Sequence, residues 1–166
     1  IINWTVIAYD GFTYSEWSNI WNFTIESFLS INLTRNSVDF GLMNVLESKD
    51  TDNGYNPFII ENNGNVYVNI TKIGLNQSPF IMAELNTSYF RYKVDNTSEL
   101  NSFDKAKSIT EWENITHIDY AEKKAIVNLN YSDINDEAQI DLNITVPLYE
   151  PGGPKSVTIY VVGELA

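Results

Sequence analysis

The chain has 166 residues, no cysteine, one histidine and a formal net charge of −12 at pH 7. Disulfide scaffolds and thiolate metal sites are therefore excluded, and an acidic surface makes nucleic acid and anionic membranes poor partners. The composition favours Asn, Thr, Ile, Val and Tyr, a mixture that is typical of β-sheets and their turns. No apolar run is long enough for a membrane span, and we expect none.

The first segment reads as a hairpin. Trp4, Val6 and Ala8 alternate with their neighbours along a predicted strand, which ends at the turn 10–11, Asp-Gly. A second alternating stretch follows at 21–25. Side chains two apart on a strand share a face, so the first strand has an apolar face that needs a sheet to pack on.

The pattern W-x-V-x-A-x-D-G followed by Y-S-E-W-S resembles the last two strands of a fibronectin type III module, over residues 1–27. The five strands that come first in such a module have no counterpart in this sequence. One interpretation is that Ile1 is a mature N-terminus, so that the pair must find a sheet either in its own second unit or, by strand addition, in another subunit. The inter-subunit strand would then carry Trp4, Val6 and Ala8. The other interpretation is that Ile1 is a boundary, with the rest of the protein upstream.

Residues 28–166 are predicted to form a second unit, an all-β immunoglobulin-like β-sandwich. A predicted strand, the Asn-Asn-Gly-Asn loop at 62–65 and a second predicted strand together resemble the B–C strand pair of immunoglobulin-like modules in archaeal and bacterial surface proteins. One short helix is predicted at 103–112. β-rich or alternating stretches predict strands at 29–34, 38–41, 57–61, 66–71, 89–94, 125–131, 140–146 and 156–162.

The sequence is rich in the N-glycosylation motif Asn-x-Ser/Thr, which occurs ten times where the composition alone gives about three. Most of these motifs have an apolar residue in the middle position. Glycosylation of an exported protein explains the excess, and so does an Asn- and Thr-rich sandwich in which polar and apolar residues alternate. The acceptors are Asn3, Asn22, Asn32, Asn69, Asn76, Asn86, Asn96, Asn114, Asn130 and Asn143.

The spacing of the motif predicts which side chains face solvent. In the stretch 141–146, Leu142 and Ile144 take one face and Asn143 and Thr145 take the other. We therefore expect the acceptors on strands to lie outside and the apolar residues to lie inside, so that a glycan would leave the core undisturbed.

Two acidic loops are weak candidates for a calcium site. The first contains Asp50 and Asp52 in a stretch similar to a D-x-D-x-D-G loop, but it is one residue short and lacks the following Glu. The second contains Asp133 and Asp136. A polar turn explains each loop equally well, and we expect no metal and no cofactor.

The remaining candidates for chemistry have simple structural explanations. His117 is the single imidazole and is expected to form local hydrogen bonds, because no Gly-x-Ser-x-Gly elbow is present to accompany it. Trp4, Trp17, Trp21 and Trp112 are expected in the core, with a sugar-stacking platform as the alternative.

Together these patterns predict a structural subunit of an extracellular filament or cell-surface layer, similar to archaeal surface glycoproteins. The expected partners are copies of the same chain and N-linked glycans, and no enzymatic activity is expected. The alternative is an adhesive or carbohydrate-binding module of a larger surface protein.

Overall fold

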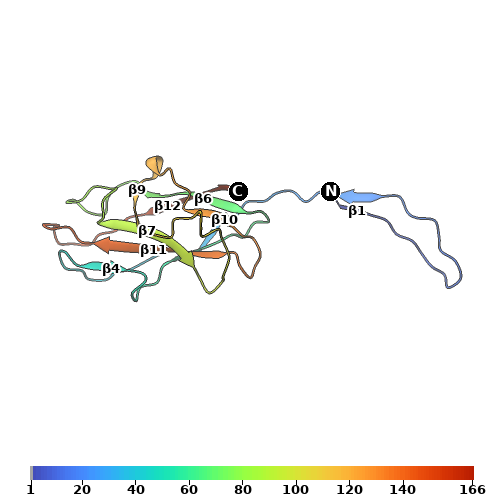
Figure 1. The fold of residues 1–166 in the computed structure, drawn as a ribbon, viewed down its shortest axis with the longest axis horizontal. Helices are drawn as coiled ribbons and strands as arrows, with labels where there is room; N and C mark the ends of the chain where they lie inside the picture. The colour runs from blue at the N-terminus through green and yellow to red at the C-terminus, as the bar shows by residue number, and fades with distance from the viewer. Residues whose placement is uncertain (1) are drawn as a thin grey trace.

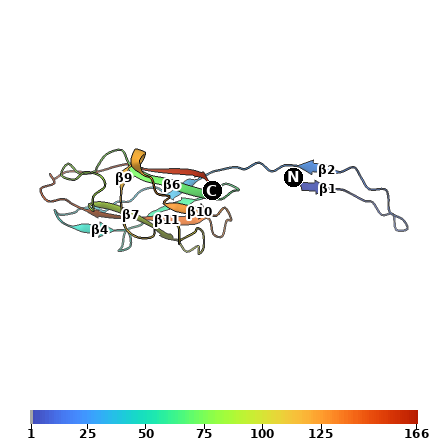
Figure 2. The ribbon, with the colours of Figure 1, turned by 45° about the horizontal axis from the view of Figure 1, so that its top comes forward.

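The computed structural model describes residues 2–166 and contains two mainly antiparallel sheets packed face to face, with a separate hairpin extending from one end (Figure 1). The hairpin contains β1 (Ile2–Trp4) and β2 (Trp21–Phe23), and we call residues 2–25 the arm. Figure 2 shows from a second direction that the arm runs away from the sandwich. The prediction of an all-β sandwich with an N-terminal hairpin extension is confirmed.

The larger sheet is centred on β11 (Glu137–Thr145), which pairs with β7 over seven residues. Its strand order is β3-β5-β11-β7-β8, and β4 pairs with the end of β11 beyond β5. The other strands of this sheet are β3 (Asn32–Arg35), β4 (Ser48–Asp50), β5 (Phe58–Glu61), β7 (Phe90–Asn96) and β8 (Glu113–Asn114).

The smaller sheet is centred on β6 (Val68–Leu75), which lies between β10 (Ile126–Leu129) and β12 (Ile159–Leu165). A short parallel strand, β9 (Thr116–His117), pairs with the end of β6 and leads into the 3₁₀ helix η1 (Ile118–Tyr120). This sheet has three strands on its main path, against five in the larger one.

The core fills the space between the two sheets. Leu142 and Val68 are buried there, as the alternating pattern predicts, and Ile144 packs against the same cluster. The fully buried members come mainly from β6, β7, β10 and β11, which are the strands rich in β-branched and aromatic residues: Val68, Ile70, Ile73, Leu75, Val94, Ile126, Leu129 and Ile140.

Two predicted elements are absent from the described residues. Residues 103–112, predicted as a helix, form turns, since Phe103 anchors the segment in the core and one turn carries an Asp104–Lys107 ion pair. Residues 38–41, predicted as a strand, run past β12 without pairing with it. Alternation describes which side chains face inward, but a strand also needs a neighbouring backbone.

Asn62 ties the two sheets together at the end where the arm leaves. Its side chain is 1% exposed and donates to the carbonyl oxygens of Val66 (2.9 Å) and Leu129 (3.1 Å). Its Oδ1 accepts from the amide of Gly64 (3.0 Å). Both donor hydrogens and the oxygen of this buried amide therefore have partners. Because Asn62 follows β5 of the larger sheet and Leu129 belongs to β10 of the smaller one, the amide joins the two sheets.

The Asn62→Ala substitution should lower the free energy of unfolding by about 3 kcal/mol, because two carbonyl groups and one amide lose a buried partner. The matched control is Asn63→Ala, since Asn63 is the exposed neighbour in the same loop. Chemical denaturation of both variants measures the difference. Equal stability of the two variants would show that Asn62 does not hold the sheets together.

Candidate functional site

The arm is a two-stranded ribbon with one apolar and one polar face. Its register places Trp4 opposite Trp21 and Asn3 opposite Asn22. Residues directly opposite each other share a face, so the two indoles lie on one side and the two acceptor asparagines on the other. The indole rings stack with centroids 6.1 Å apart. The ribbon therefore presents an aromatic surface and, on its back, two glycosylation motifs.

The apolar face of the arm is open to solvent. Trp4 is 49% exposed, Val6 52%, Trp21 59% and Phe23 50%. A contiguous apolar face of this kind marks a surface for another protein or a ligand more often than it marks free surface. The arm therefore carries a candidate contact surface, on the side that also bears Ala8.

Serine side chains and a tight turn extend the ribbon beyond its two short strands. The carbonyl oxygens of Val6 and Ala8 accept from the amides of Ser18 and Ser15, and the Val6 and Ala8 amides donate to the hydroxyls of the same serines. Val6 and Ala8 are two positions apart, whereas Ser15 and Ser18 are three apart, so the second strand has one extra residue and the ribbon has a bulge here. At the tip, the Asp10 carboxylate accepts the amides of residues 12 and 13, and these backbone hydrogen bonds lower its pKa.

The base of the arm is clamped to the sandwich by Asn65. The Asn65 side chain donates to the Glu26 carbonyl (2.9 Å) and accepts the Phe28 amide (2.7 Å), and the Asn65 amide donates to the Phe28 carbonyl (3.0 Å). Gly64 is required for this approach, because a Cβ there would lie 2.4 Å from the Phe28 carbonyl oxygen. Three hydrogen bonds therefore hold the point at which the arm leaves.

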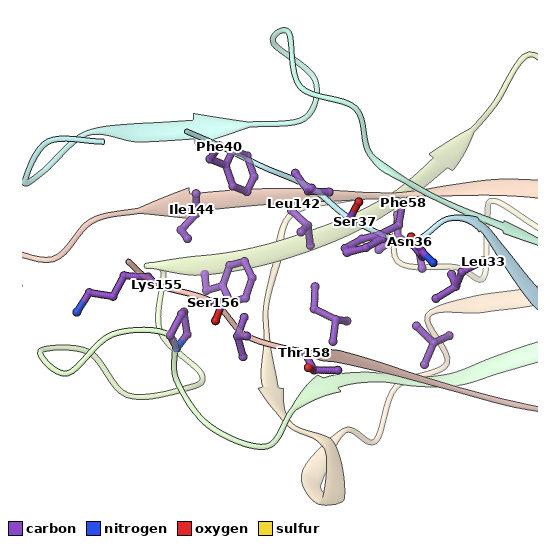
Figure 3. Close-up of a pocket in the computed structure, with 17 residues that line it drawn as sticks. Leu33, Asn36, Ser37, Phe40, Phe58, Leu142, Ile144, Lys155, Ser156 and Thr158 are labelled. Carbon is purple, nitrogen blue, oxygen red and sulfur yellow. The ribbon is translucent and has the colours of Figure 1, made fainter. Parts of the chain in front are cut away.

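A groove opens into the core on one side of the sandwich, where the two sheets differ in width. It has a volume of about 330 Å³ and lies between β12, with the residues before it, and the segment 36–40. Figure 3 shows Phe40, Leu142 and Ile144 on the side of the larger sheet, with Ser156 and Thr158 on the facing segment. Most of the lining side chains are apolar.

One end of the groove is fixed by a buried carboxylate. The Glu150 side chain is 2% exposed, accepts the amides of Ile81 and Met82, and pairs with Lys155, which lines the groove. Charge-assisted hydrogen bonds hold this carboxylate in place. Through its pair with Lys155, the carboxylate also anchors the residues before β12, which form no strand pairing within residues 2–166.

The ten acceptor asparagines differ in their exposure. Five are exposed, three are half-buried, and two lie on interior strands of the sheets. The exposed ones are Asn3, Asn22, Asn32, Asn76 and Asn86, and the half-buried ones are Asn96, Asn114 and Asn130.

The expectation that acceptors on strands point to solvent is wrong for Asn69 and Asn143. Asn69 is 4% exposed and accepts the Asn128 amide, and Asn143 is 6% exposed. Asn143 lies between β4 and β7, where its side chain accepts from Arg91 and donates to Ser48. Neighbouring strands and loops cover the outer faces of β6 and β11 at these positions, so the polar side of a strand is not a solvent-facing side there.

The tryptophans also depart from expectation. Trp4, Trp17 and Trp21 are 49%, 65% and 59% exposed, so the prediction that they belong to the core is wrong. Trp112 is half-buried on the outside of the larger sheet, where Arg91 and Lys93 lie over its ring at 5.9 and 5.1 Å. Alternation places residues on a common face but does not supply the cover for that face.

The acidic candidates are dispersed among ordinary contacts. The Asp50 carboxylate accepts from the side chain of Asn53, and Asp52 pairs with Lys93 at 2.7 Å. Over residues 2–166, no three histidine or carboxylate groups are arranged to hold a metal ion. Asp136 is buried, and burial raises its pKa to about 6, with the nearby carboxylates of residues 61, 99 and 133 adding to the effect.

His117 has the local role that the sequence predicts. It precedes η1, and its Nδ1 accepts the amide of Asp119 at 3.3 Å.

Comparison of the chain with protein-family models, curated proteins and solved structures gives no significant match. Within the described part of the chain, no helix has the length and apolar character needed to cross a membrane.

Sequence reasoning located the arm and missed the groove. Val38 and Phe40 line the groove. Their alternation in the sequence indicated an inward-facing apolar segment, although it gave no sign that the neighbouring strand edge is open. The difference in width between the sheets has no local signal, because it depends on strand order. The Asn65 clamp has no local signal either, because Asn65 bonds Phe28 and Glu26, which precede it by 37 and 39 positions in the sequence.

The Asp136→Asn substitution should change how stability depends on pH. Because the folded state holds the Asp136 proton up to about pH 6 and the unfolded state releases it near 3.8, the wild type loses stability as pH rises through that interval. The variant should lack this loss, so its advantage in unfolding midpoint should grow from about pH 4 to about pH 7. Asp119→Asn, at an exposed carboxylate, is the control. A constant difference across this range would contradict the raised pKa.

Proposed function

We propose that the chain is an N-glycosylated, non-catalytic structural subunit of an extracellular filament or cell-surface layer, joined to its neighbours through the arm by strand addition. One observation carries this proposal: a ribbon that leaves the sandwich holds Trp4, Val6, Trp21 and Phe23 about half exposed on a single face. Full burial of an exposed apolar side chain contributes about 1.5–3 kcal/mol, so each of these half-covered side chains would contribute roughly half of that against a partner.

The sequence pattern of the arm supports the same proposal. The arm resembles the terminal strand pair of a fibronectin type III module, and in such modules the inward face of the pair lies against further strands. A partner sheet from a neighbouring subunit gives the face that cover through backbone pairing and apolar contact. Because a contact between two different surfaces of the subunit is heterologous, its repetition produces an open filament or layer.

Glycosylation fits the polar side of the arm and the outer loops. Asn3 and Asn22 lie opposite each other on the face that carries no indole. Glycans there would leave the aromatic face free and would prevent the ribbon from pairing through its other side. The proposal thus assigns the two faces of one ribbon to two purposes, contact and protection.

A second function, carbohydrate binding by an adhesive module, is favoured by the stacked indoles. Trp4 and Trp21 lie side by side with about half of their surface open, and exposed aromatic rings are suited to stack on sugar rings. A glycan array separates this function from assembly, since sugar binding that is lost in Trp4→Ser, without any change in self-association, would favour the adhesive module.

Glycan occupancy should follow burial. Site-resolved mass spectrometry of native material should find glycans at the exposed acceptors Asn3, Asn22, Asn32, Asn76 and Asn86, and unmodified peptides at Asn69 and Asn143, because a glycan cannot be accommodated at a side chain 4% or 6% exposed. An intact mass equal to that of the polypeptide alone would rule out glycosylation. Occupied Asn69 or Asn143 would contradict the burial argument.

The assembly proposal predicts that the arm's indoles are required for ordered structures. Negative-stain imaging of the wild type should show filaments or sheets, whereas the double variant Trp4→Ser/Trp21→Ser should show single particles, because the apolar contact is lost. Tyr120→Ser removes an exposed aromatic residue outside the arm and should leave the assemblies unchanged. Assemblies that survive the double substitution, or a wild type that forms none, would overturn the proposal.

A further inference from the structure

We propose that the groove between β12 and the segment 36–40 is the acceptor for the arm of a second copy of this chain, which adds to the free edge of β12. This inference rests on the proposed assembly function and names the second surface of the contact. The acceptor has three features that favour strand addition: a free strand edge, a mostly apolar lining, and a lining charge, Lys155, that is already paired with Glu150.

The free edge belongs to β12. This strand pairs with β6 on one side, and no strand among residues 2–166 pairs with its other side. Edge strands usually carry charges that discourage pairing, but residues 156–163 contain no charged side chain. Tyr160 and Val162 on the outer face of β12 are 41% and 42% exposed. The edge is therefore open to pairing.

The uncovered lining results from the unequal width of the two sheets. The larger sheet has five strands on its main path and the smaller has three, and β12 is the last strand on the side of the groove. The side chains of Leu33, Phe40, Phe58 and Val157 line the opening. A two-stranded ribbon added to β12 would make the sheets equal in width, with its apolar face directed at this lining.

The arm matches the acceptor in chemistry. Residues 2–9 carry no charged side chain, and those at 17–25 carry none either; the acidic residues Asp10 and Glu16 lie at the tip. The ribbon can therefore enter an apolar groove without burying a charge, which would cost several kcal/mol per ion by general estimates. The polar face, with Asn3 and Asn22, would remain outside.

The occupant is a second copy because the arm of the same chain points elsewhere. The Asn65 clamp fixes the base of the arm at the end of the sandwich, and Figures 1 and 2 show the arm running away from the body in both views. The groove lies along the side of the sandwich, beside β12. One chain thus offers a donor and an acceptor that do not meet within it.

Two variants test the two halves of the contact in the complete, recombinant, unglycosylated chain. Val6→Lys places a charge on the apolar face of the arm, and Thr5→Lys places the same charge on its polar face as the control. Ser37→Trp fills the mouth of the groove at an exposed position, and Ala106→Trp adds the same bulk on a distant exposed turn. Because positions 6 and 37 are largely exposed, thermal unfolding should be unchanged in both variants.

Sedimentation velocity should show concentration-dependent association for the wild type and both controls, and a single chain of 18.9 kDa for Val6→Lys and for Ser37→Trp. Mixing these two variants should yield a 1:1 dimer, since one supplies an intact groove and the other an intact arm. Substituting Val157→Lys inside the groove should repeat the effect of Ser37→Trp.

The outcomes separate this inference from the proposed function. If Val6→Lys is a monomer but Ser37→Trp and Val157→Lys associate like the wild type, the arm assembles the protein through another surface and the groove proposal is wrong. If the mixed variants form no dimer, the arm does not enter the groove. If the wild type is a monomer at every concentration, both the assembly function and the groove proposal fail.

Discussion

The loop Asn62-Asn63-Gly64-Asn65 is the constraint on which both parts of the molecule depend. Asn62 connects the end of β5 to Leu129 of β10 and so holds the two sheets in contact. Two residues later, the missing side chain of Gly64 lets the Phe28 carbonyl approach, and Asn65 then binds the backbone on both sides of residue 27. Three of these four residues, Asn62, Gly64 and Asn65, thus hold the two sheets together and fix the point where the arm leaves.

This arrangement has a consequence for assembly. A donor strand on a long flexible linker explores many positions and pays an ordering cost on each encounter, whereas the Asn65 clamp fixes the point from which this ribbon leaves and so reduces that cost. The same clamp keeps the arm from the groove of its own chain. Under the proposed function, a clamped base would disfavour a closed monomer and favour contact between copies, which an open assembly requires.

Periodicity in the sequence predicted a large part of the fold. Alternation located the strands of the core and placed Val68 and Leu142 inside, because side-chain phase along a strand is a local property. It placed Asn69 and Asn143 outside, which is wrong, since what covers the second face of a strand depends on distant segments. Trp4 and Trp21 show the reverse error: both were predicted to lie in the core, and the cover that a core requires is not among residues 2–166. The groove could not be predicted for the same reason, because it arises from strand order.

The distribution of charge bears on the specificity of the proposed assembly. A net charge of −12 makes copies of the chain repel one another over most of their surface, so non-specific association is opposed. Residues 2–9 of the arm and 156–163 beside the groove are free of charge, so the repulsion is weakest where these two segments meet. The polar face of the ribbon, with Asn3 and Asn22, further restricts contact to one side. An exposed apolar ribbon is otherwise an aggregation risk, and in the proposed assembly the repulsion elsewhere on the surface would oppose modes of association other than arm to groove.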